Sequence, residues 1–366
     1  MSERNFITHH IGGGGLCWHL PERYINLKPV SYGSFGCVCS AKDTLTNCQV
    51  AIKLLKKPFD VLELAKRTYR ELAVLSHMKH ENVVHLVDAF SNQKSIDEFE
   101  DLYLVMPFMP IDLARVLQNE SLDDEQILLF SYQILRGLKY IHGAKILHRD
   151  LKPANIIVNE DLELQIADFG LARNVENLRD NRSYVMTRSY RAPEVLTKWL
   201  DYNETVDIWS AACIFVEMKT GTPLFNDILK VQQVRHILQV TGKPDEIMMQ
   251  KISSQHSCSY IENMDVPQKS NLAEIFPWAC AELLDLLARM LELDPDRRLK
   301  AAEALEHPYF QRYHDDENEE VGTPWEDPLL EEISLTEDEW KEATWNFLKN
   351  FEQGTLSQPS TSQAPN

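Results

Sequence analysis

The spacing of apolar residues changes character once along the chain. From Tyr24 to about Leu104, apolar residues alternate with polar ones or form short β-branched runs, as in CQVAIKLL and DLYLVM, and both patterns predict β-strands. One stretch in this part, AKRTYRELAVLSHM, has helical spacing instead. Beyond Asp112 the pattern is helical, and DDEQILLFSYQILRGLKYIHGA keeps a broad apolar face. We therefore expect a small β-rich part with one helix, followed by a mostly helical part.

Two parts also fit the length, because 366 residues exceed the size at which one hydrophobic core stops growing. The fold class we predict is α+β, with two lobes. Pro110, in FMPID, is a plausible hinge between them because proline cannot continue a helix or donate to a sheet. The predicted divisions are a flexible Gly-rich start (1–18), a first lobe (about 24–106), a hinge (about 107–112), a second lobe (about 113–310), an acidic C-terminal extension (311–352) and a disordered tail (353–366).

Composition narrows the class of protein. With 44% apolar and 25% charged residues the chain is ordinary for a soluble domain, and no apolar run approaches the roughly 20 residues of a membrane span. No secretory signal is evident at the start, so we expect a cytoplasmic and nuclear protein. The seven cysteines form no CxxC pair and no Cys/His cluster with zinc spacing, which predicts neither disulfides nor a structural metal.

The net charge of −19 is unevenly distributed. From Asp315 to Glu339 there are twelve acidic residues and no Lys or Arg. Such a balance disfavours binding to nucleic acid, whose backbone is also negative. The run is either a solvated surface, which is the commoner case, or a landing site for a basic peptide.

A turn rich in small residues, VSYGSFGCV (30–38), lies between two predicted strands. Backbone N–H groups at Gly33 and Gly36 could cover phosphates, although an ordinary hairpin has the same appearance. A strand follows the turn, which disfavours a dinucleotide fold. The next strand, VAIK, would aim Lys53 at those phosphates, and Glu71 on the predicted helix could hold its ammonium; taken alone, such a pair is more often a surface contact.

The strongest signal is LHRDLKPANIIV followed by ADFG. One short loop would present Asp150 as an acceptor for a hydroxyl proton, Lys152 as a cation for a phosphoryl group and Asn155 as a metal-binding amide. Asp168 adds a hard oxygen ligand of the kind Mg²⁺ prefers. With APE at 192–194, the order and spacing predict phosphoryl transfer.

These motifs, RDLKPANIIV, DFGLAR and YRAPE, resemble those of the eukaryotic protein kinases over roughly residues 24–310. LPERYINLKPV, MKHENVVHLVDAF and DPDRRLKAAEALEHPYFQRYHD are further similar to the stress-activated mitogen-activated protein kinases, most of all to their osmotic-stress branch. The resemblance implies the bilobal protein-kinase fold, ATP and Mg²⁺ as cofactors, and a C-terminal extension, DEWKEATWNFLKNF, that runs back over the N-lobe. It also implies a pairing of Glu194 with Arg298.

The resemblance assigns roles that agree with this chemistry. Lys53 and Glu71 would orient the ATP phosphates, Asp150 would take the hydroxyl proton, Lys152 would steady the γ-phosphoryl group, and Asn155 with Asp168 would hold Mg²⁺. Ser31 replaces the family's first loop glycine, and Met106 stands at the gatekeeper position, where its bulk should narrow the pocket behind the adenine. The implied ATP-binding residues are Val30, Ser31, Tyr32, Gly33, Ser34, Phe35, Gly36, Cys37, Val38, Ala51, Lys53, Glu71, Met106, Met109 and Asp112.

The segment between DFG and APE departs from the family. Aligning Tyr184 with the family's phosphotyrosine puts Arg182 where the acceptor threonine normally stands. We expect control mainly through Tyr184, with Ser183 as a second candidate, while Arg182 either joins the phosphate-receiving arginines or points to solvent. Ser189 replaces an aromatic near the proline-accepting pocket. The implied phosphate-receiving residues are Arg67, Arg70, Arg149, Arg188 and Arg191.

An acidic docking surface is also implied, formed by Glu160 and Asp161 together with Asp315, Asp316 and Glu317. It would recruit basic motifs of an upstream dual-specificity kinase, of protein substrates and of phosphatases. The predicted function is therefore a Ser/Thr-Pro-directed kinase in a stress-responsive cascade, with no nucleic acid or membrane partner. The alternative is a pseudokinase scaffold, which has no chemical need for the complete catalytic set.

Overall fold

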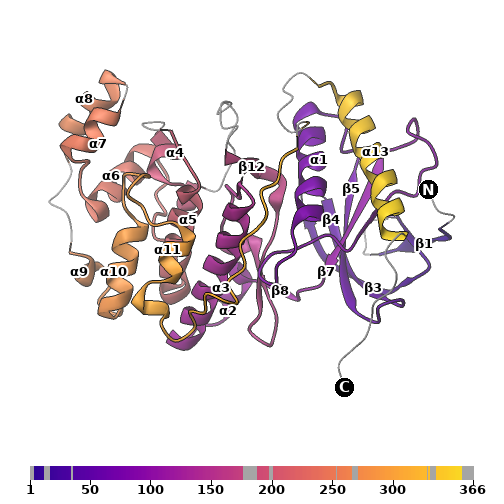
Figure 1. Ribbon diagram of the computed structural model, residues 1–366, viewed down its shortest axis with the longest axis horizontal. Coiled ribbons are helices and arrows are strands. Elements are labelled where there is room, and N and C mark those ends of the chain that lie inside the picture. The colour runs from indigo at the N-terminus through magenta and orange to yellow at the C-terminus, as the bar shows by residue number, and fades with distance from the viewer. Residues whose placement is uncertain are drawn as a thin grey trace. The chain divides into compact units, whose positions relative to one another are not determined.

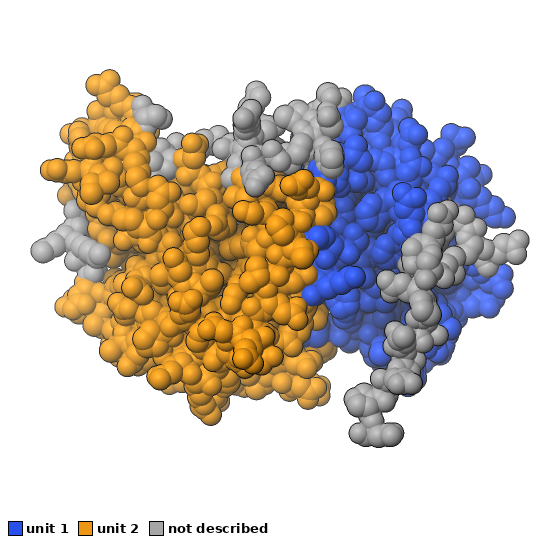
Figure 2. Space-filling view, viewed as in Figure 1, with its two compact units in different colours: residues 1–79, 84–109, 327–366 blue, residues 80–83, 110–326 orange. Residues whose placement is uncertain are grey.

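The chain divides into two compact units. Unit 1 comprises residues 1–79, 84–109 and 327–366, and unit 2 comprises residues 80–83 and 110–326 (Figure 2). The computed structural model describes residues 4–11, 17–33, 36–175, 188–197, 201–252, 254–265, 271–327, 329 and 335–356.

Unit 1 is built on an antiparallel sheet of five strands in the order β3-β4-β5-β7-β6 (Figure 1). Runs of alternating and β-branched residues form the strands, as predicted. Tyr24, Phe90 and Tyr103 stack in the core, with ring centroids 6.0 and 5.0 Å apart along the stack. The strands are β3 (Tyr24–Gly33), β4 (Gly36–Asp43), β5 (Gln49–Lys56), β6 (Asp88–Phe90) and β7 (Asp101–Pro107).

The N-terminal residues differ from the flexible start expected of them. Strands β1 (Phe6–His10) and β2 (Cys17–Pro21) pair in antiparallel fashion, and Trp18 and Leu20 of β2 are buried in the core of unit 1. Arg4 continues this anchoring, since its guanidinium donates to both carboxylate oxygens of Asp88 at 2.8 and 3.1 Å. The glycine-rich sequence between the strands does not predict this pairing, which is stabilised by tertiary contacts of β2.

Among the described residues of unit 1, helices α1 (Leu62–His77) and α13 (Glu337–Leu356) lie side by side (Figure 1). Helix α1 forms where helical spacing predicted it. Helix α13 lies in the C-terminal extension and buries Trp340, Trp345 and Leu348. The Trp340 ring meets Tyr69 of α1 at 5.3 Å, so the expectation that the extension returns to the N-lobe is confirmed. Helix α13 also extends to Leu356, into the region expected to be a disordered tail.

Unit 2 is mainly helical, which together with unit 1 confirms the predicted bilobal α+β class. Helix α3 begins with a capping box, in which the Asp123 carboxylate accepts from the Gln126 N–H at 2.8 Å and the Gln126 side chain accepts from the Asp123 N–H at 3.0 Å. Helix α5 is apolar on nearly all sides and is almost wholly buried. The helices are α2 (Leu113–Asn119), α3 (Asp124–Gly143), α4 (Pro193–Thr197), α5 (Thr205–Thr220), α6 (Lys230–Thr241), α7 (Glu246–Lys251), α8 (Gln255–Asn263), α9 (Leu272–Ile275), α10 (Ala281–Met290) and α11 (Ala301–Leu305).

Short strands and 3₁₀ turns lie among the loops of unit 2. The strands form a three-stranded sheet in the order β11-β10-β8 and a two-stranded pair of β12 with β9. The strands are β8 (Ile111–Asp112), β9 (Ile146–Leu147), β10 (Ile156–Val158), β11 (Leu164–Ile166) and β12 (Arg173–Asn174), and the 3₁₀ turns are η1 (Pro153–Asn155), η2 (Phe169–Leu171), η4 (Arg188–Tyr190) and η5 (Pro308–Phe310). Across the described residues, no helix combines the length and apolar character needed to cross a membrane.

Candidate active site

Unit 1 brings Lys53 and Glu71 together. Lys53 lies on β5, opposite Val38 of β4 and Leu104 of β7. Its Nζ forms an ion pair with Glu71 Oε1 of α1, and both side chains are largely buried, with exposed fractions of 14% and 5%. A partly desolvated pair holds its geometry better than the surface contact that was the alternative. The predicted pairing of strand lysine and helix glutamate is therefore present.

The glycine-containing turn joins β3 and β4, and its ends pair as Gly33 opposite Gly36. Gly36 has φ of +138°, and a Cβ there would lie 2.5 Å from the Leu54 carbonyl oxygen. Only glycine fits this backbone. Ser34 and Phe35, two of the predicted ATP-binding residues, lie outside the described part of the chain.

Other predicted ATP-binding residues line the same strands. Ala51 pairs with Met106 across β5 and β7, and both side chains are half-buried. Because alternate residues of a strand share a face, Ala51 lies on the same face as Lys53. Asp112, the last of the predicted set, caps α2: its Oδ1 accepts from the Arg115 N–H at 2.9 Å. The remaining members on the sheet are Val30, Ser31, Tyr32, Cys37 and Val38, while Met109 follows β7.

The loop between β9 and β10 in unit 2 gathers the three predicted catalytic residues. Lys152 Nζ lies 2.8 Å from Asp150 Oδ2. Asn155 Nδ2 donates to the Asp150 backbone oxygen at 2.8 Å and to Oδ2 at 3.1 Å. Both amide hydrogens of Asn155 therefore face Asp150, which leaves its Oδ1 as the atom available to a cation.

Asp168 is tied to the same loop through the backbone. The Ala167 N–H donates to the Asn155 oxygen at 2.8 Å, which fixes the residue before Asp168 beside Asn155. Asp168 itself has φ of +64°. Phe169 is fully buried and packs edge-on against His148 at 5.1 Å. An amide oxygen and a carboxylate are hard ligands, so the residues present fit Mg²⁺.

A buried carboxylate that the sequence analysis did not single out holds this loop. Asp207 of α5 accepts from the backbone N–H groups of His148 and Arg149, each at 2.8 Å, and from His142 Nε2 at 3.0 Å. Burial raises the pKa of Asp207, but the hydrogen bonds and the histidines outweigh it and lower the pKa overall. The signal in the sequence is one charged residue inside the apolar helix TVDIWSAACIF.

The predicted phosphate-receiving arginines are distributed over both units. Arg67 and Arg70 lie on α1 of unit 1. In unit 2, Arg149 is buried beneath the Tyr202 ring at 5.6 Å, and exposed Arg188 donates to the Ile228 oxygen. Arg191 follows Arg188 in the η4 region, where the Arg191 N–H donates to the Arg188 oxygen at 3.1 Å. Arg182, Ser183 and Tyr184 lie outside the described residues.

The predicted tie between Glu194 and Arg298 is confirmed. The two Arg298 nitrogens donate to the two Glu194 oxygens at 2.7 and 3.0 Å, and both side chains are fully buried. Arg298 also stacks over Trp209 at 5.2 Å. The APE segment is thereby fixed to the interior of unit 2.

The two acidic loops predicted to form a docking surface are anchored on neighbouring residues of α3. Gln133 Nε2 donates to the Leu162 oxygen, in the loop with Glu160 and Asp161, at 2.8 Å. Tyr132 donates to Glu319, in the loop with Asp315, Asp316 and Glu317, at 3.0 Å. All five predicted docking side chains are exposed.

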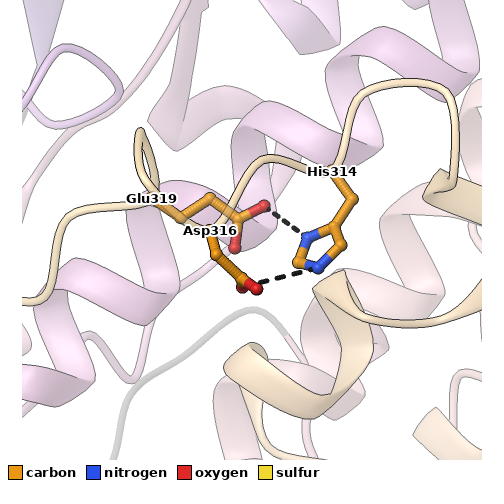
Figure 3. A group of neighbouring side chains, drawn as sticks. All are labelled: His314, Asp316 and Glu319. Carbon is orange, nitrogen blue, oxygen red and sulfur yellow. Dashed lines mark hydrogen bonds and ion pairs between the residues drawn. The ribbon is translucent and has the colours of Figure 1, made fainter.

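Glu319 differs from the solvated run in which it lies, because its side chain is fully buried. Figure 3 shows the His314 imidazole contacting two carboxylates: Nδ1 lies 2.9 Å from Glu319 and Nε2 lies 3.4 Å from Asp316. Although these three side chains lie close enough to share a cation, Glu319 already binds the Lys139 ammonium at 3.0 Å. Burial raises the pKa of Glu319, but hydrogen bonds from His314, Lys139 and Tyr132 lower it overall. The group therefore organises the acidic loop.

Comparison with known proteins decides the family. Residues 24–310 match the protein kinase domain. The chain is 48% identical over 350 residues to mitogen-activated protein kinase 14 of Xenopus laevis, covering 96% of each protein. The chain belongs to the mitogen-activated protein kinases. Mitogen-activated protein kinase 12 of Mus musculus is 45% identical, covering 91% of this chain and 90% of that protein, and mitogen-activated protein kinase pmk-1 of Caenorhabditis elegans is 44% identical, covering 92% and 88%.

This mitogen-activated protein kinase is accordingly an ATP-dependent protein serine/threonine kinase, as its motifs predicted. The relatives also agree with the stress-activated type that the sequence resembles. Protein kinases in general use ATP with Mg²⁺.

Proposed function

We propose that this kinase transfers the γ-phosphate of ATP to Ser and Thr residues followed by Pro, within a stress-responsive cascade. The observation that carries the chemistry is the geometry around Asp150. Lys152 and Asn155 both contact its Oδ2, at 2.8 and 3.1 Å, which fixes the carboxylate. A carboxylate fixed in this way can accept the proton of an attacking hydroxyl group.

The other predicted residues have complementary roles in the proposal. Lys53, oriented by Glu71, binds the α- and β-phosphates, and Lys152 stabilises the transferring group. Asn155 and Asp168 hold Mg²⁺, which when bound neutralises the charge of the phosphates. Each of these residues positions or stabilises charge, and this is most of what phosphoryl transfer requires of a protein.

The chemistry is tested with purified protein, Mg·ATP and matched peptides that contain Ser-Pro or Ser-Ala. Asp150→Asn and Asp168→Ala should reduce transfer at least about 100-fold, and Ser-Pro should be preferred over Ser-Ala. Equal background transfer by wild type and both variants, after treatment with an activating kinase, would establish the scaffold alternative. Equal use of the two peptides would exclude proline direction; Ser189, half-buried in η4, makes this comparison necessary.

Regulation is proposed to depend mainly on Tyr184, which lies outside the described residues. A phosphate there adds nearly two negative charges, and the guanidinium groups of Arg188 and Arg191, which follow Tyr184 in the sequence, would receive them through charge-assisted hydrogen bonds. Tyr184→Phe should therefore depress activity after treatment with a dual-specificity kinase, and Arg182→Thr should raise it by restoring a second acceptor. Activity of Tyr184→Phe equal to wild type, before and after treatment, would exclude the phosphotyrosine switch.

The partners we propose are an upstream dual-specificity kinase, substrates and phosphatases that carry basic docking motifs. The support is that both acidic loops are anchored on Tyr132 and Gln133, adjacent residues of α3. Their exposed carboxylates would attract a basic segment and speed its encounter.

A further inference from the structure

The outward face of the N-terminal hairpin gathers two histidines and a cysteine. The register of β1 and β2 places His10 opposite Cys17, and Thr8 opposite His19. Because alternate residues of a strand face the same side, Cys17 and His19 project together, while Trp18 and Leu20 are buried on the other side.

The first two of these side chains already have the spacing of metal ligands. His10 Nδ1 lies 3.5 Å from Cys17 Sγ. In tetrahedral zinc sites the Zn–N distance is about 2.0–2.1 Å and the Zn–S distance about 2.3 Å, so two such ligands lie about 3.5 Å apart. The hydrogen bond between these two side chains therefore has the length of one edge of a zinc tetrahedron.

His19 lies two residues from Cys17 on the same face of β2 and offers a third ligand. Its Nδ1 lies 3.0 Å from the Thr8 hydroxyl oxygen, and its backbone N–H donates to the Tyr103 hydroxyl at 3.0 Å. Histidines that bind metals commonly use one ring nitrogen for the metal and the other for a hydrogen bond that orients the ring. Because Nδ1 contacts Thr8, Nε2 is the nitrogen assigned to the ion, and metal binding requires the ring to turn toward His10 and Cys17 and the Thr8 contact to adjust with it.

We propose that the hairpin binds one Zn²⁺ through Cys17, His10 and His19, with water at the fourth position. On binding, the Cys17 thiol releases its proton to solvent and its sulfur forms the bond to zinc. Thiolate and imidazole ligands select zinc over Mg²⁺, which prefers oxygen, so this site is separate from the metal used in phosphoryl transfer. Sequence spacing did not reveal it because the ligands are brought together by strand register.

The test uses the full chain, freed of metal with a chelator and titrated with Co²⁺ in place of Zn²⁺. A thiolate bound to Co²⁺ gives a sulfur-to-metal charge-transfer band, which we expect to saturate at one equivalent and to disappear when Zn²⁺ is added. Cys17→Ser should abolish the band. His10→Ala and His19→Ala should each weaken binding at least about tenfold, because even residues that only support a ligand cost this much.

Two matched controls locate the site. Cys48→Ser removes a different cysteine, which is exposed and whose sulfur donates to the Thr46 oxygen, and it should leave the band unchanged. His314→Ala removes the histidine of the acidic loop and should also have no effect. The melting temperature of every variant is measured, so that loss of metal binding can be distinguished from misfolding. In addition, Zn²⁺ should slow amide exchange in residues 6–10 of the wild type but not of Cys17→Ser.

Several results would overturn the proposal. They are the absence of a band in wild type, a band that survives in Cys17→Ser, and an affinity of His19→Ala equal to that of wild type. Loss of binding in His314→Ala with retention in the hairpin variants would assign the metal to the acidic loop instead.

Discussion

Two aspartates of unit 2, Asp150 and Asp207, have different roles because their carboxylates have different hydrogen-bond partners. Asp150 is itself buried, with 6% of its surface exposed, and side chains of its own loop fix its carboxylate. Asp207 is fully buried and binds the backbone on which Asp150 is mounted. The residue proposed to act in chemistry is thus distinct from the residue that holds its backbone in place.

Asp207→Asn should destabilise the fold and change its dependence on pH. The pKa of Asp207 is lowered in the folded state, so the ionised carboxylate contributes stability above its unfolded pKa of about 3.9, and this is lost as pH falls through the lower folded value. An amide cannot accept from all three donors, which costs about 1–3 kcal/mol at pH 7. Urea unfolding between pH 2 and 7 should show the loss and a flatter acid limb; an unchanged acid limb would contradict this account.

Lys53→Met should lower the rate of phosphoryl transfer at least about 100-fold, because it removes the cation that Glu71 orients. Lys56→Met, three residues further along β5 and exposed, is the matched control and should retain activity. The measurement is initial rate at saturating peptide. Parallel losses in the two variants would indicate damage to the strand and not loss of a phosphate contact.

Contacts within and between contiguous motifs could be predicted from the sequence, such as the pairing of Lys53 with Glu71 and the gathering of Asp150 and Asn155 on one loop. Those of Asp207 and Glu319 could not. The burial of Glu319 depends on Tyr132 and Lys139, which are remote in the sequence, and its own surroundings look like a solvated acidic run. Local patterns carry no information about such long-range partners.

At the scale of elements, helices were more predictable than strand pairs. The spacing of apolar residues was sufficient to place α1 and α3, because a helix satisfies its own backbone. The β1–β2 hairpin depends on which residues lie opposite one another, and a glycine-rich connection obscured it. Short strands such as β8 and β12 have too few residues for any period to appear.

Helix α13 should contribute substantially to stability, although it lies far from α1 in the sequence. Trp340 is 1% exposed and contacts Tyr69 of α1, so Trp340→Ala should cost about 3–5 kcal/mol of unfolding free energy. Asn346→Ala, on the exposed face of the same helix, should cost little. Denaturant melts of the two variants make the comparison, and similar values would show that α13 is only loosely attached.

The buried pair that fastens α4 should behave as one unit. Arg298→Met alone leaves Glu194 charged and buried, and should cost about 3–5 kcal/mol. Adding Glu194→Leu should recover part of that loss, because no uncompensated charge remains. A double-mutant cycle of unfolding free energies is the measurement, and strictly additive losses would mean that the two groups are not coupled.

At the scale of the whole molecule, the net charge of −19 should favour the binding of positively charged partners. Reversing Asp315, Asp316 and Glu317 to Lys should weaken a basic docking peptide at least about tenfold at low salt and leave ATP affinity unchanged. Reversing Glu246, Glu262 and Glu274, which are exposed elsewhere on unit 2, makes the same change in net charge and should have a much smaller effect. Fluorescence anisotropy across a salt series is the measurement; equal losses would point to net charge instead of a docking surface.

The division of the chain has a consequence for how the protein is made. Unit 2 is nearly continuous in the sequence, whereas unit 1 draws on the first residues, a middle segment and the last helix. Because domains fold as the chain leaves the ribosome, unit 2 can finish folding while unit 1 still lacks α13. The face of α1 that Tyr69 presents to Trp340 therefore stays uncovered until α13 has been synthesised, and a nascent chain stalled before residue 337 would expose apolar surface to chaperones.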